Sequence, residues 1–427
     1  MLRRPAQVPY GTQGGAATVT ADDRVPTVVL VGTLDTKGKE YSYFRDRIRE
    51  RGVEVLLVDA GILGEPLTEP DVTRQEVAAA AGVDVQALAD ARDRGAAIEA
   101  MSRGAAEIVL RLHAEGRFDA IGALGGTGGS ALATYAMQRL PVGVPKLMVS
   151  TAASGDTSRY FGPVDVTMMY SVVDIAGLNT ILTRILVNAA GALAGMATAA
   201  APPPGEDRPV IVASMWGLTT PCVTVARERL EELGYEVLVF HQIGLGGRSL
   251  EEVVKTGAVV GVLDITTTEL ADEIGGGIWP AGPERLEVAG RLGIPQVVSL
   301  GALDVVTIGP PEPLPERFAG RPIYIHNDVL AATRTTQDEC REIGALVARK
   351  LNAAKGPTVL FVPLRGLSLL ATEGQVFHDP EADQALFSTL RELVDRSRVE
   401  LNEVDADVND PEFALAMAER LHELVTG

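Results

Sequence analysis

A run of six residues with small side chains has the composition of a phosphate-binding loop. The run is GGTGGS, and it stands between an apolar stretch typical of a strand and a stretch typical of a helix. Glycines let the backbone turn tightly and let a ligand approach the backbone amides. The first turn of a helix adds unpaired N–H donors and a partial positive charge. We therefore predict an anion site here, although tight strand–helix packing is an alternative reason for the glycines. The predicted site residues are Gly125, Gly126, Thr127, Gly128, Gly129 and Ser130.

The surrounding sequence narrows the kind of anion. It contains no G-x-x-x-x-G-K-[ST] motif, which excludes a P-loop. Residues 126–131 fit the loose G-x-G-x-x-A form of the dinucleotide fingerprint, but that fingerprint also needs an acidic residue at the end of the next strand. The next predicted strand ends in MVST, so NAD is disfavoured.

Three further loops offer polar groups near the glycine run, because the carboxyl ends of parallel strands share one edge of a sheet. GTLDTKG, at residues 32–38, has a lysine that can meet phosphates and an aspartate that can hold Mg²⁺ or cap a helix. Asp59 ends the second predicted strand, where a ribose contact is usual, and a plain surface carboxylate is the alternative. The predicted nucleotide ligands in these loops are Gly32, Thr33, Asp35, Thr36, Lys37, Asp59, Ser154 and Gly155, and the predicted Mg²⁺ ligands are Asp35 and Asp156.

The second half of the chain carries a cysteine and a histidine near the ends of predicted strands. Cys222 stands at the second position of a predicted helix, where the helix dipole lowers the pKa of a thiol. We predict catalytic roles for Cys222, His241 and Glu269, and a small buried hydrophobic cysteine is the alternative. A neighbouring site for a small anionic metabolite is predicted, with an arginine binding a carboxylate. Its residues are Thr219, Thr220, Thr267, Thr268, His326 and Arg334.

Strands and helices alternate along the chain, as they do in doubly wound sheets. Short β-branched runs such as TVVLVG, at residues 27–32, predict buried parallel strands, and the amphipathic stretches between them predict helices. The pattern occurs twice, since RDRIRERGVEVLLVDAGILG at 45–64 resembles RERLEELGYEVLVFHQIGLG at 227–246. We therefore predict an α/β fold of two Rossmann-like domains with mostly parallel sheets and a cleft between them.

A Pro-rich stretch, ATAAAPPPGEDRP, marks the predicted domain boundary. We predict a flexible extension at 1–24, a nucleotide-binding domain at 25–196, a linker at 197–208 and a second domain at 209–427. The apolar stretch at 175–196 resembles a membrane span, but two asparagines and an arginine interrupt it. We expect a buried helix instead, no membrane partner, and a homo-oligomer of two or more subunits.

The composition of the chain limits the classes of partner that we expect. The net charge of −19 disfavours nucleic acid, which needs a basic surface, but it permits small anionic ligands at local sites. The two cysteines form neither a disulfide framework nor a zinc quartet, which fits a reducing cytoplasm. We therefore expect a cytoplasmic protein with small-molecule ligands.

The motifs GTLDTKGKE, VDAG, GGTGGS, STAASGD, DVTMMYSVVDIAGLN, TTPC, DITTTELAD, SLGALD and RTTQDEC follow one another in this order. In this respect the chain resembles the ATP-binding N-terminal part of the tomato mosaic virus resistance protein family, which has uncharacterised bacterial and fungal relatives. The resemblance covers nearly everything after residue 24. It implies two Rossmann-like subdomains that bind ATP with Mg²⁺ in the first, but it does not assign individual contacts or carry over an antiviral role.

Two classes of function remain open from the sequence. The first is an enzyme that binds ATP in its first domain and an anionic metabolite in its second. The second is a nucleotide-responsive regulatory protein without turnover. A polar cleft where Glu269, His326 and Arg334 converge favours the enzyme, and a sealed site favours the regulator.

Overall fold

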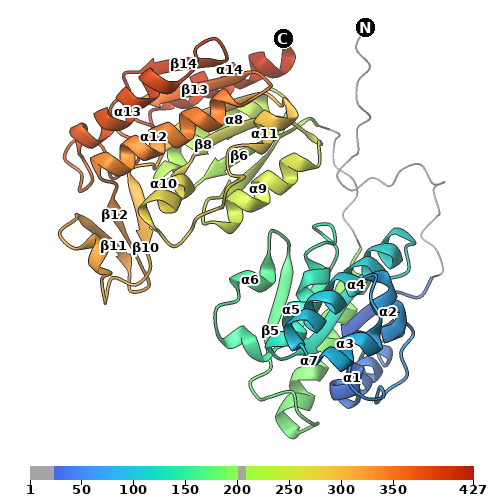
Figure 1. Ribbon diagram of the computed structural model, residues 1–427. Coiled ribbons are helices and arrows are strands. Elements are labelled where there is room, and N and C mark those ends of the chain that lie inside the picture. Colours follow the sequence, from blue (N-terminus) through green and yellow to red (C-terminus); the bar gives the residue numbers. More distant parts are fainter. Residues whose placement is uncertain (1–23, 201–207) are drawn as a thin grey trace. The chain divides into compact units, whose positions relative to one another are not determined.

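The computed structural model describes residues 24–200 and 208–427, which divide into two compact units (Figure 1). We call residues 24–200 the amino-terminal unit and residues 208–427 the carboxy-terminal unit. The predicted extension, apart from Arg24, and most of the predicted linker lie outside the described residues. The last helix of the amino-terminal unit continues to Thr198, so it includes the first two residues of the predicted linker, Ala197 and Thr198.

The amino-terminal unit contains one five-stranded parallel sheet with the order β2-β1-β3-β4-β5. Its inner strands are fully buried because β-branched and small apolar residues fill both faces. The chain leaves β1 toward one edge and returns as β3 on the other side, so the strand order reverses between β1 and β3. The strands are β1 (Thr27–Gly32), β2 (Glu54–Asp59), β3 (Ala120–Gly125), β4 (Lys146–Ser150) and β5 (Val166–Tyr170).

Helices cover both faces of this sheet (Figure 1). Apolar side chains of α2, α4 and α5 pack on one face, and those of α1 and α7 pack on the other. The bounds are α1 (Leu34–Arg49), α2 (Arg74–Ala80), α3 (Val85–Ala91), α4 (Arg94–Ala114), α5 (Thr127–Met137), α6 (Ser158–Phe161) and α7 (Thr180–Thr198), with a 3₁₀ turn at Thr151–Ser154.

The carboxy-terminal unit contains a six-stranded parallel sheet with the order β14-β13-β9-β8-β6-β7. Read from β7, this is the strand order of the first sheet with one strand added. A three-stranded antiparallel sheet, β10-β12-β11, is inserted after β9, and the sequence did not predict it. The strands are β6 (Val210–Met215), β7 (Glu236–His241), β8 (Val259–Thr266), β9 (Gln296–Gly301), β10 (Val305–Ile308), β11 (Ile323–Asn327), β12 (Leu330–Arg334), β13 (Thr358–Pro363) and β14 (Val399–Val404).

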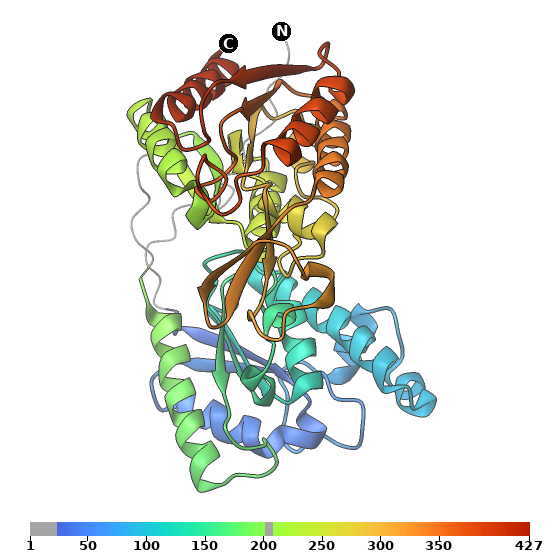
Figure 2. The same ribbon diagram turned by 90° about the vertical axis from the view of Figure 1, so that its left-hand side faces the viewer.

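Helices α8 and α14 cover one face of the six-stranded sheet, and α9 to α13 cover the other (Figure 2). The bounds are α8 (Thr220–Glu232), α9 (Leu245–Lys255), α10 (Thr268–Gly275), α11 (Val288–Leu292), α12 (Gln337–Asn352), α13 (Pro380–Leu393) and α14 (Pro411–Thr426), with 3₁₀ turns at Gly217–Thr219 and Glu316–Phe318. The predicted α/β class, with two mostly parallel sheets, is confirmed.

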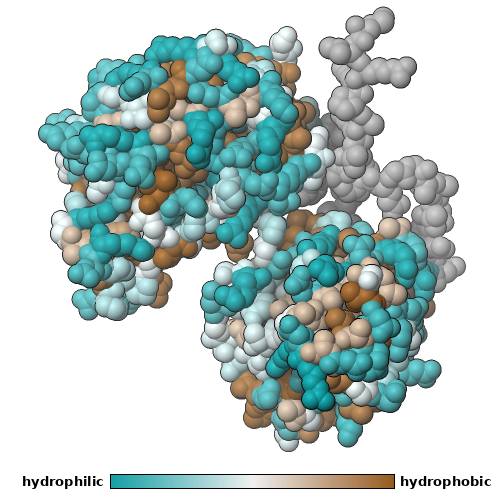
Figure 3. All heavy atoms as spheres, in the orientation of Figure 1, coloured by the Kyte–Doolittle hydropathy of each residue, from teal (hydrophilic) through white to brown (hydrophobic). Residues whose placement is uncertain are grey.

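One helix of the described chain, α7, is long and apolar enough to cross a membrane by length and composition alone. Its inner side carries Leu182, Leu186 and Leu193, which are fully buried against the first sheet. Hydrophilic residues dominate the visible surface of each unit, with apolar residues scattered between them (Figure 3).

Candidate functional site

The glycine run lies where the order of the first sheet reverses. Gly125 ends β3, and α5 begins at Thr127 after an extended Gly126 that offers no side-chain cap. Ligands of doubly wound sheets bind at this reversal, outside the carboxyl ends of the strands. The fold therefore brings the helix terminus and the reversal point together.

Three backbone amides at the start of α5 are bare. No described residue accepts a hydrogen bond from the N–H groups of Thr127, Gly128 or Gly129. The next amide, of Ser130, already donates to the carbonyl of Gly126 at 2.8 Å. These three donors and the partial positive charge of the helix can bind an anion.

The glycines differ in whether packing requires them. A side chain at Gly125 would meet the backbone of Gly129 at 3.2 Å, so packing explains this glycine. A Cβ at Gly126 would meet only the Thr151 hydroxyl, at 3.6 Å, which is an ordinary contact. Packing alone therefore does not explain the missing side chain at Gly126, which leaves the neighbouring amides open.

Ser130 has a structural role rather than a ligand-facing one. Its hydroxyl and the hydroxyl of Ser150 are 2.6 Å apart, and both residues are fully buried. This hydrogen bond joins the first turn of α5 to the end of β4. It fixes the direction of the bare amides but leaves no free group on Ser130 at the surface.

An arginine that the sequence did not indicate lies beside the glycine run. Arg94 is the first residue of α4, and its Nη2 lies 3.5 Å from the position that a Cβ on Gly128 would take. It is exposed, and no described carboxylate pairs with it. A cation at a helix N-terminus is unfavourable by about 0.3–1 kcal/mol, so helix stability does not explain it. Its placement depends on α4 packing against α5, for which no local sequence signal exists.

The loop after β1 is braced rather than open. Lys37 Nζ donates to the carbonyl of Ile175, and Asp35 accepts a 2.6 Å hydrogen bond from the amide of Leu63. The Asp35 carboxylate lies against Gly61, where a Cβ would come within 2.6 Å of it. Gly32 is required by packing, because a Cβ there would overlap the ring of Tyr41. The hydroxyls of Thr33 and Thr36 are 2.9 Å apart near the surface and remain available.

Asp59 does not have the ribose-facing position that was predicted. Its carboxylate is buried and accepts hydrogen bonds from the amides of Leu34 and Gly61 at 3.0 and 2.9 Å. Arg74 Nε donates to its second oxygen at 2.8 Å. Both of its oxygens are engaged inside the unit, so Asp59 caps the start of α1 and neutralises a buried arginine.

The loop after β4 reaches the surface. Ser154 and Gly155 are exposed, and so is Asp156, which accepts a 2.9 Å hydrogen bond from the amide of Ser158. Hydrogen bonds from Ser158 hold the pKa of Asp156 below its usual value. Among residues 24–200 and 208–427 no group of three His, Cys, Asp or Glu side chains is arranged to hold a metal ion.

The predicted activation of Cys222 is wrong. Its side chain is fully buried with Ile211 and Leu263 on the sheet face covered by α8 and α14, and burial raises the pKa of its thiol. Asp264 points to the opposite face, because side chains alternate along β8. The sheet therefore separates the thiol from the acids. The sequence could not predict this separation, because it does not indicate which face the helix after β6 covers.

Glu269 belongs to a buried ion cluster. One of its oxygens accepts from the amides of Gly244 and Gly247, at 2.7 and 3.1 Å, and the other accepts from Arg285 Nε at 2.8 Å. Burial raises its pKa despite the arginine. The same arginine also pairs with Asp264 through two nitrogens. Glu269 therefore caps the start of α9 and is not placed to exchange protons with solvent.

The predicted metabolite residues do not converge. Thr219, Thr267 and Thr268 are buried, and Arg334 is 3% exposed and pairs with Asp383 at 2.6 Å. The exposed ones are His326 on β11 and Thr220 at the start of α8. His241, which was predicted to be catalytic, is also exposed, at the end of β7. No single open site within the carboxy-terminal unit contains these residues.

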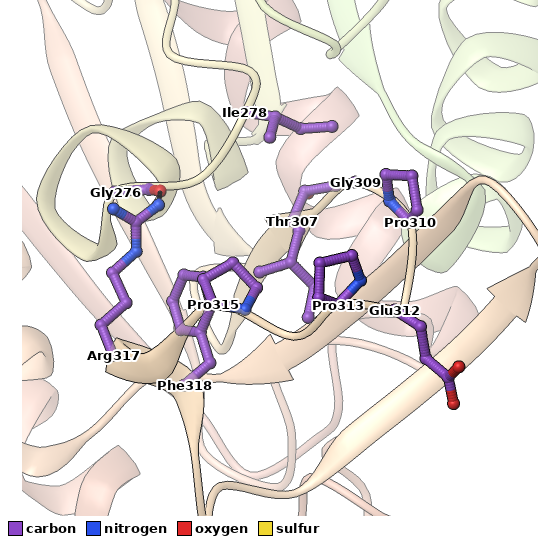
Figure 4. Close-up of a pocket in the computed structure, with 11 residues that line it drawn as sticks. Gly276, Ile278, Thr307, Gly309, Pro310, Glu312, Pro313, Pro315, Arg317 and Phe318 are labelled. Carbon is purple, nitrogen blue, oxygen red and sulfur yellow. Dashed lines mark hydrogen bonds between the residues drawn. The ribbon is translucent and has the colours of Figure 1, made fainter.

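A pocket of about 250 Å³ lies on the inserted antiparallel sheet (Figure 4). Prolines surround Thr307, and Arg317 stands at one side with its guanidinium on the carbonyl of Gly276. The lining is mostly apolar, from Ile278, Ile308, Pro310, Pro313, Pro315 and Phe318. None of the predicted site residues lines it.

Two family models match nearly the whole described chain. The N-terminal domain of the uncharacterised protein family UPF0261 matches residues 26–202, and its C-terminal domain matches residues 208–425. The chain belongs to this family. A UPF0261 protein of Clostridium tetani is 49% identical over 394 residues, which are 92% of this chain and 98% of that protein.

A tomato relative supports the sequence resemblance. The ToMV resistance protein Tm-1(GCR237) of Solanum lycopersicum is 34% identical over 426 residues, which are 95% of this chain and 56% of that protein. Among solved structures, a UDP-N-acetylglucosamine 2-epimerase from Rickettsia bellii is 10% identical with a TM-score of 0.23, covering 64% of this chain and 79% of that one. A similarity of that size carries no argument about ligand or reaction.

Proposed function

We propose that this UPF0261 protein binds ATP, with Mg²⁺, through the glycine run of its amino-terminal unit. The observation that carries the proposal is the set of three bare amides at the start of α5, at the point where the strand order reverses. An extended Gly126 leaves these amides open, and Ser130 fixes their direction. Such a terminus suits phosphate oxygens.

A phosphate fits these donors better than a carboxylate does. The amides and the exposed hydroxyl of Thr127 supply more donors than one carboxylate needs, and Arg94 adds an unpaired cation. Arginine binds phosphate through two parallel hydrogen bonds. The adenine base comes from the family resemblance and not from a contact in the structure.

The metal requires few protein ligands. Mg²⁺ usually keeps several waters and binds one or two carboxylates together with the substrate phosphates. Of the two predicted ligands, Asp35 is turned toward Gly61, whereas Asp156 is exposed after β4. Asp156 is therefore the better candidate. When bound, the metal would neutralise phosphate charge.

The wider function that we propose is an enzyme of small-molecule metabolism whose anionic metabolite binds the carboxy-terminal unit. A second candidate is a nucleotide-responsive regulatory protein without turnover. One observation favours the second candidate, since Glu269 and Arg334 are buried and already paired. Release of ADP or phosphate from ATP in the presence of metabolites would separate the two.

Calorimetry with Mg-ATP tests the nucleotide site. In Gly126→Val the new side chain fits the extended backbone but covers the amides, so we expect ATP affinity to fall at least tenfold. The matched control is Gly195→Val on the outer side of α7, where a Cβ meets no atom within 4 Å and binding should not change. Equal affinity in both variants would show that the phosphates do not bind at this loop. An intact protein that does not bind Mg-ATP would overturn the proposal.

A further inference from the structure

A long irregular segment covers part of the carboxyl edge of the second sheet. Residues 364–379 join β13 to α13 without helix or strand, and we call them the strap. Irregular loops of this length are uncommon in compact domains and usually serve as lids or binding loops. The strap follows a strand end, which is where doubly wound sheets bind ligands.

The strap contacts two buried ionisable side chains. Its Ser368 hydroxyl donates to Asp304 Oδ2 at 2.7 Å, and its Phe377 carbonyl accepts from Arg334 Nε at 2.9 Å. Asp304 is fully buried and Arg334 is 3% exposed. The strap therefore supplies one donor to the acid and one acceptor to the guanidinium, as a ligand would.

One oxygen of the acid still lacks a hydrogen-bond donor among the described residues. Asp304 Oδ1 is buried, and no described residue donates a hydrogen bond to it. Buried polar atoms without partners are rare, because leaving one unpaired costs about 1–3 kcal/mol. A missing donor at this oxygen is an observation independent of the loop. It points to a group that the protein itself does not supply.

The strap has a fixed part and an exposed part. Leu367 is buried in the apolar core beside Cys340, and Phe377 packs with Ala302 and Val305. Residues 372–376, between them, lie mostly at the surface, and Gly374 has a φ of 84° that favours glycine. The exposed middle of the strap can therefore change conformation most easily, whereas opening over Asp304 and Arg334 must also release Ser368 and the ring of Phe377 from their buried contacts.

We propose that the strap is a lid over a metabolite site formed by Arg334 and Asp304. The ligand class is a small metabolite with a carboxylate next to a hydroxyl or ammonium group. The carboxylate takes the place of the Phe377 carbonyl at Arg334, and the donor satisfies Asp304 Oδ1. This assignment rests on the proposed function, whose metabolite it specifies, and it explains why the arginine is buried in the closed form.

Two cysteines allow the lid to be tested. Cys340 lies behind Arg334, with its Sγ 3.8 Å from Nη1, whereas Cys222 is buried on the other face of the sheet. If the strap opens by itself, iodoacetamide labels Cys340 much faster than Cys222 without denaturant. We expect at least a tenfold difference, and a further increase for Cys340 alone in Ser368→Ala. Urea unfolding of Ser368→Ala checks that the fold is intact.

The labelling experiment can overturn the lid and the ligand class separately. Equal labelling rates for the two cysteines, with the same urea dependence, would show that the strap opens only on global unfolding and would overturn the lid. In a second arm, 10 mM malate or serine should slow Cys340 labelling, whereas succinate, which has no donor, should not. Protection by succinate alone, or by none of the three, would overturn the ligand class. Mg-ATP calorimetry is a separate readout, so this inference and the nucleotide site can fail independently.

Discussion

The loops after β3 and β8 occupy the same place in two sheets of the same strand order, but their side chains are opposite in kind. After β3 the chain has glycines, and among the described residues its first helical amides have no acceptor and Arg94 beside them pairs with no carboxylate. After β8 it has three buried threonines and Glu269, whose carboxylate already lies at the start of α9 against Arg285. One unit leaves the amides at this strand end open, and the other fills the strand end with buried side chains, one of which is the carboxylate that caps the neighbouring helix α9. The same fold can therefore hold a ligand site or a fixed ion cluster, depending on side chains at one strand end.

The largest effect is expected where the filled site is broken. Arg285→Ala leaves Asp264 and Glu269 buried without their cation, which typically costs 3–5 kcal/mol. Both tryptophans, Trp216 and Trp279, lie in the carboxy-terminal unit, so urea unfolding followed by tryptophan fluorescence reports this unit.

A matched control is Arg291→Ala, because Arg291 is exposed and pairs at the surface with Glu284. Its loss should cost less than about 1 kcal/mol. Similar losses for Arg285→Ala and Arg291→Ala would mean that the buried cluster does not hold the filled site together.

The next effect concerns the open site. Arg94→Gln removes a cation that has no described partner, so ATP affinity should fall by about 10- to 100-fold. Stability should stay the same or rise by about 0.3–1 kcal/mol, since a cation is removed from a helix N-terminus. Calorimetry and thermal unfolding measure the two quantities. Arg103→Gln, on the exposed side of α4, is the control and should leave binding unchanged. Loss of stability without loss of binding would assign Arg94 to the fold.

A smaller effect is expected from pH. Burial raises the pKa of Glu251, Asp272 and Asp383 to about 7, and all three lie in the carboxy-terminal unit. Between their ordinary values near 4 and pH 7 the folded unit holds protons that the unfolded chain has released. Its stability should therefore fall as pH rises from 5 to 7, by roughly 1–3 kcal/mol. Partial desolvation lowers the pKa of the exposed His241, which opposes this trend in part.

The amino-terminal unit should respond in the opposite direction. Burial lowers the pKa of His113, so stability is lost as pH falls below the usual histidine value. Urea midpoints at pH 5, 6 and 7, from tryptophan fluorescence and from circular dichroism, compare the two units. In Asp272→Asn the change of the fluorescence-detected urea midpoint with pH should become smaller. A carboxy-terminal unit that gains stability from pH 5 to 7 would contradict the assignment of raised acid pKa values.

Local sequence determined the elements better than it determined the contacts between them. Runs such as Thr27–Gly32 predict buried strands because their composition suits both faces of a parallel sheet. The start of α5 was predictable for a similar reason, since glycines and hydroxyls directly precede a helical pattern.

Contacts between distant segments were not predictable. Arg94 reaches the glycine run only through the packing of two helices, and Asp59 is engaged by Arg74 at the start of α2. Cys222 is predicted to share a site with Glu269, because the sequence does not indicate which face of the sheet a helix covers. Arg334 has the residue type of a carboxylate ligand, but its partner Asp383 comes from α13. In each case the role of the residue depends on packing or on a partner that lies far away in the sequence, so the residue type alone does not predict it.

Hydrogen–deuterium exchange with and without Mg-ATP tests the central claim most directly. The amides of Thr127, Gly128 and Gly129 have no described acceptor, so a phosphate bound there should slow their exchange. The corresponding segment at the end of β8, from Thr266 to Glu269, should not change, because its residues are buried. ATP that binds while exchange at residues 127–129 stays the same, or that protects only the segment after β8, would contradict the account.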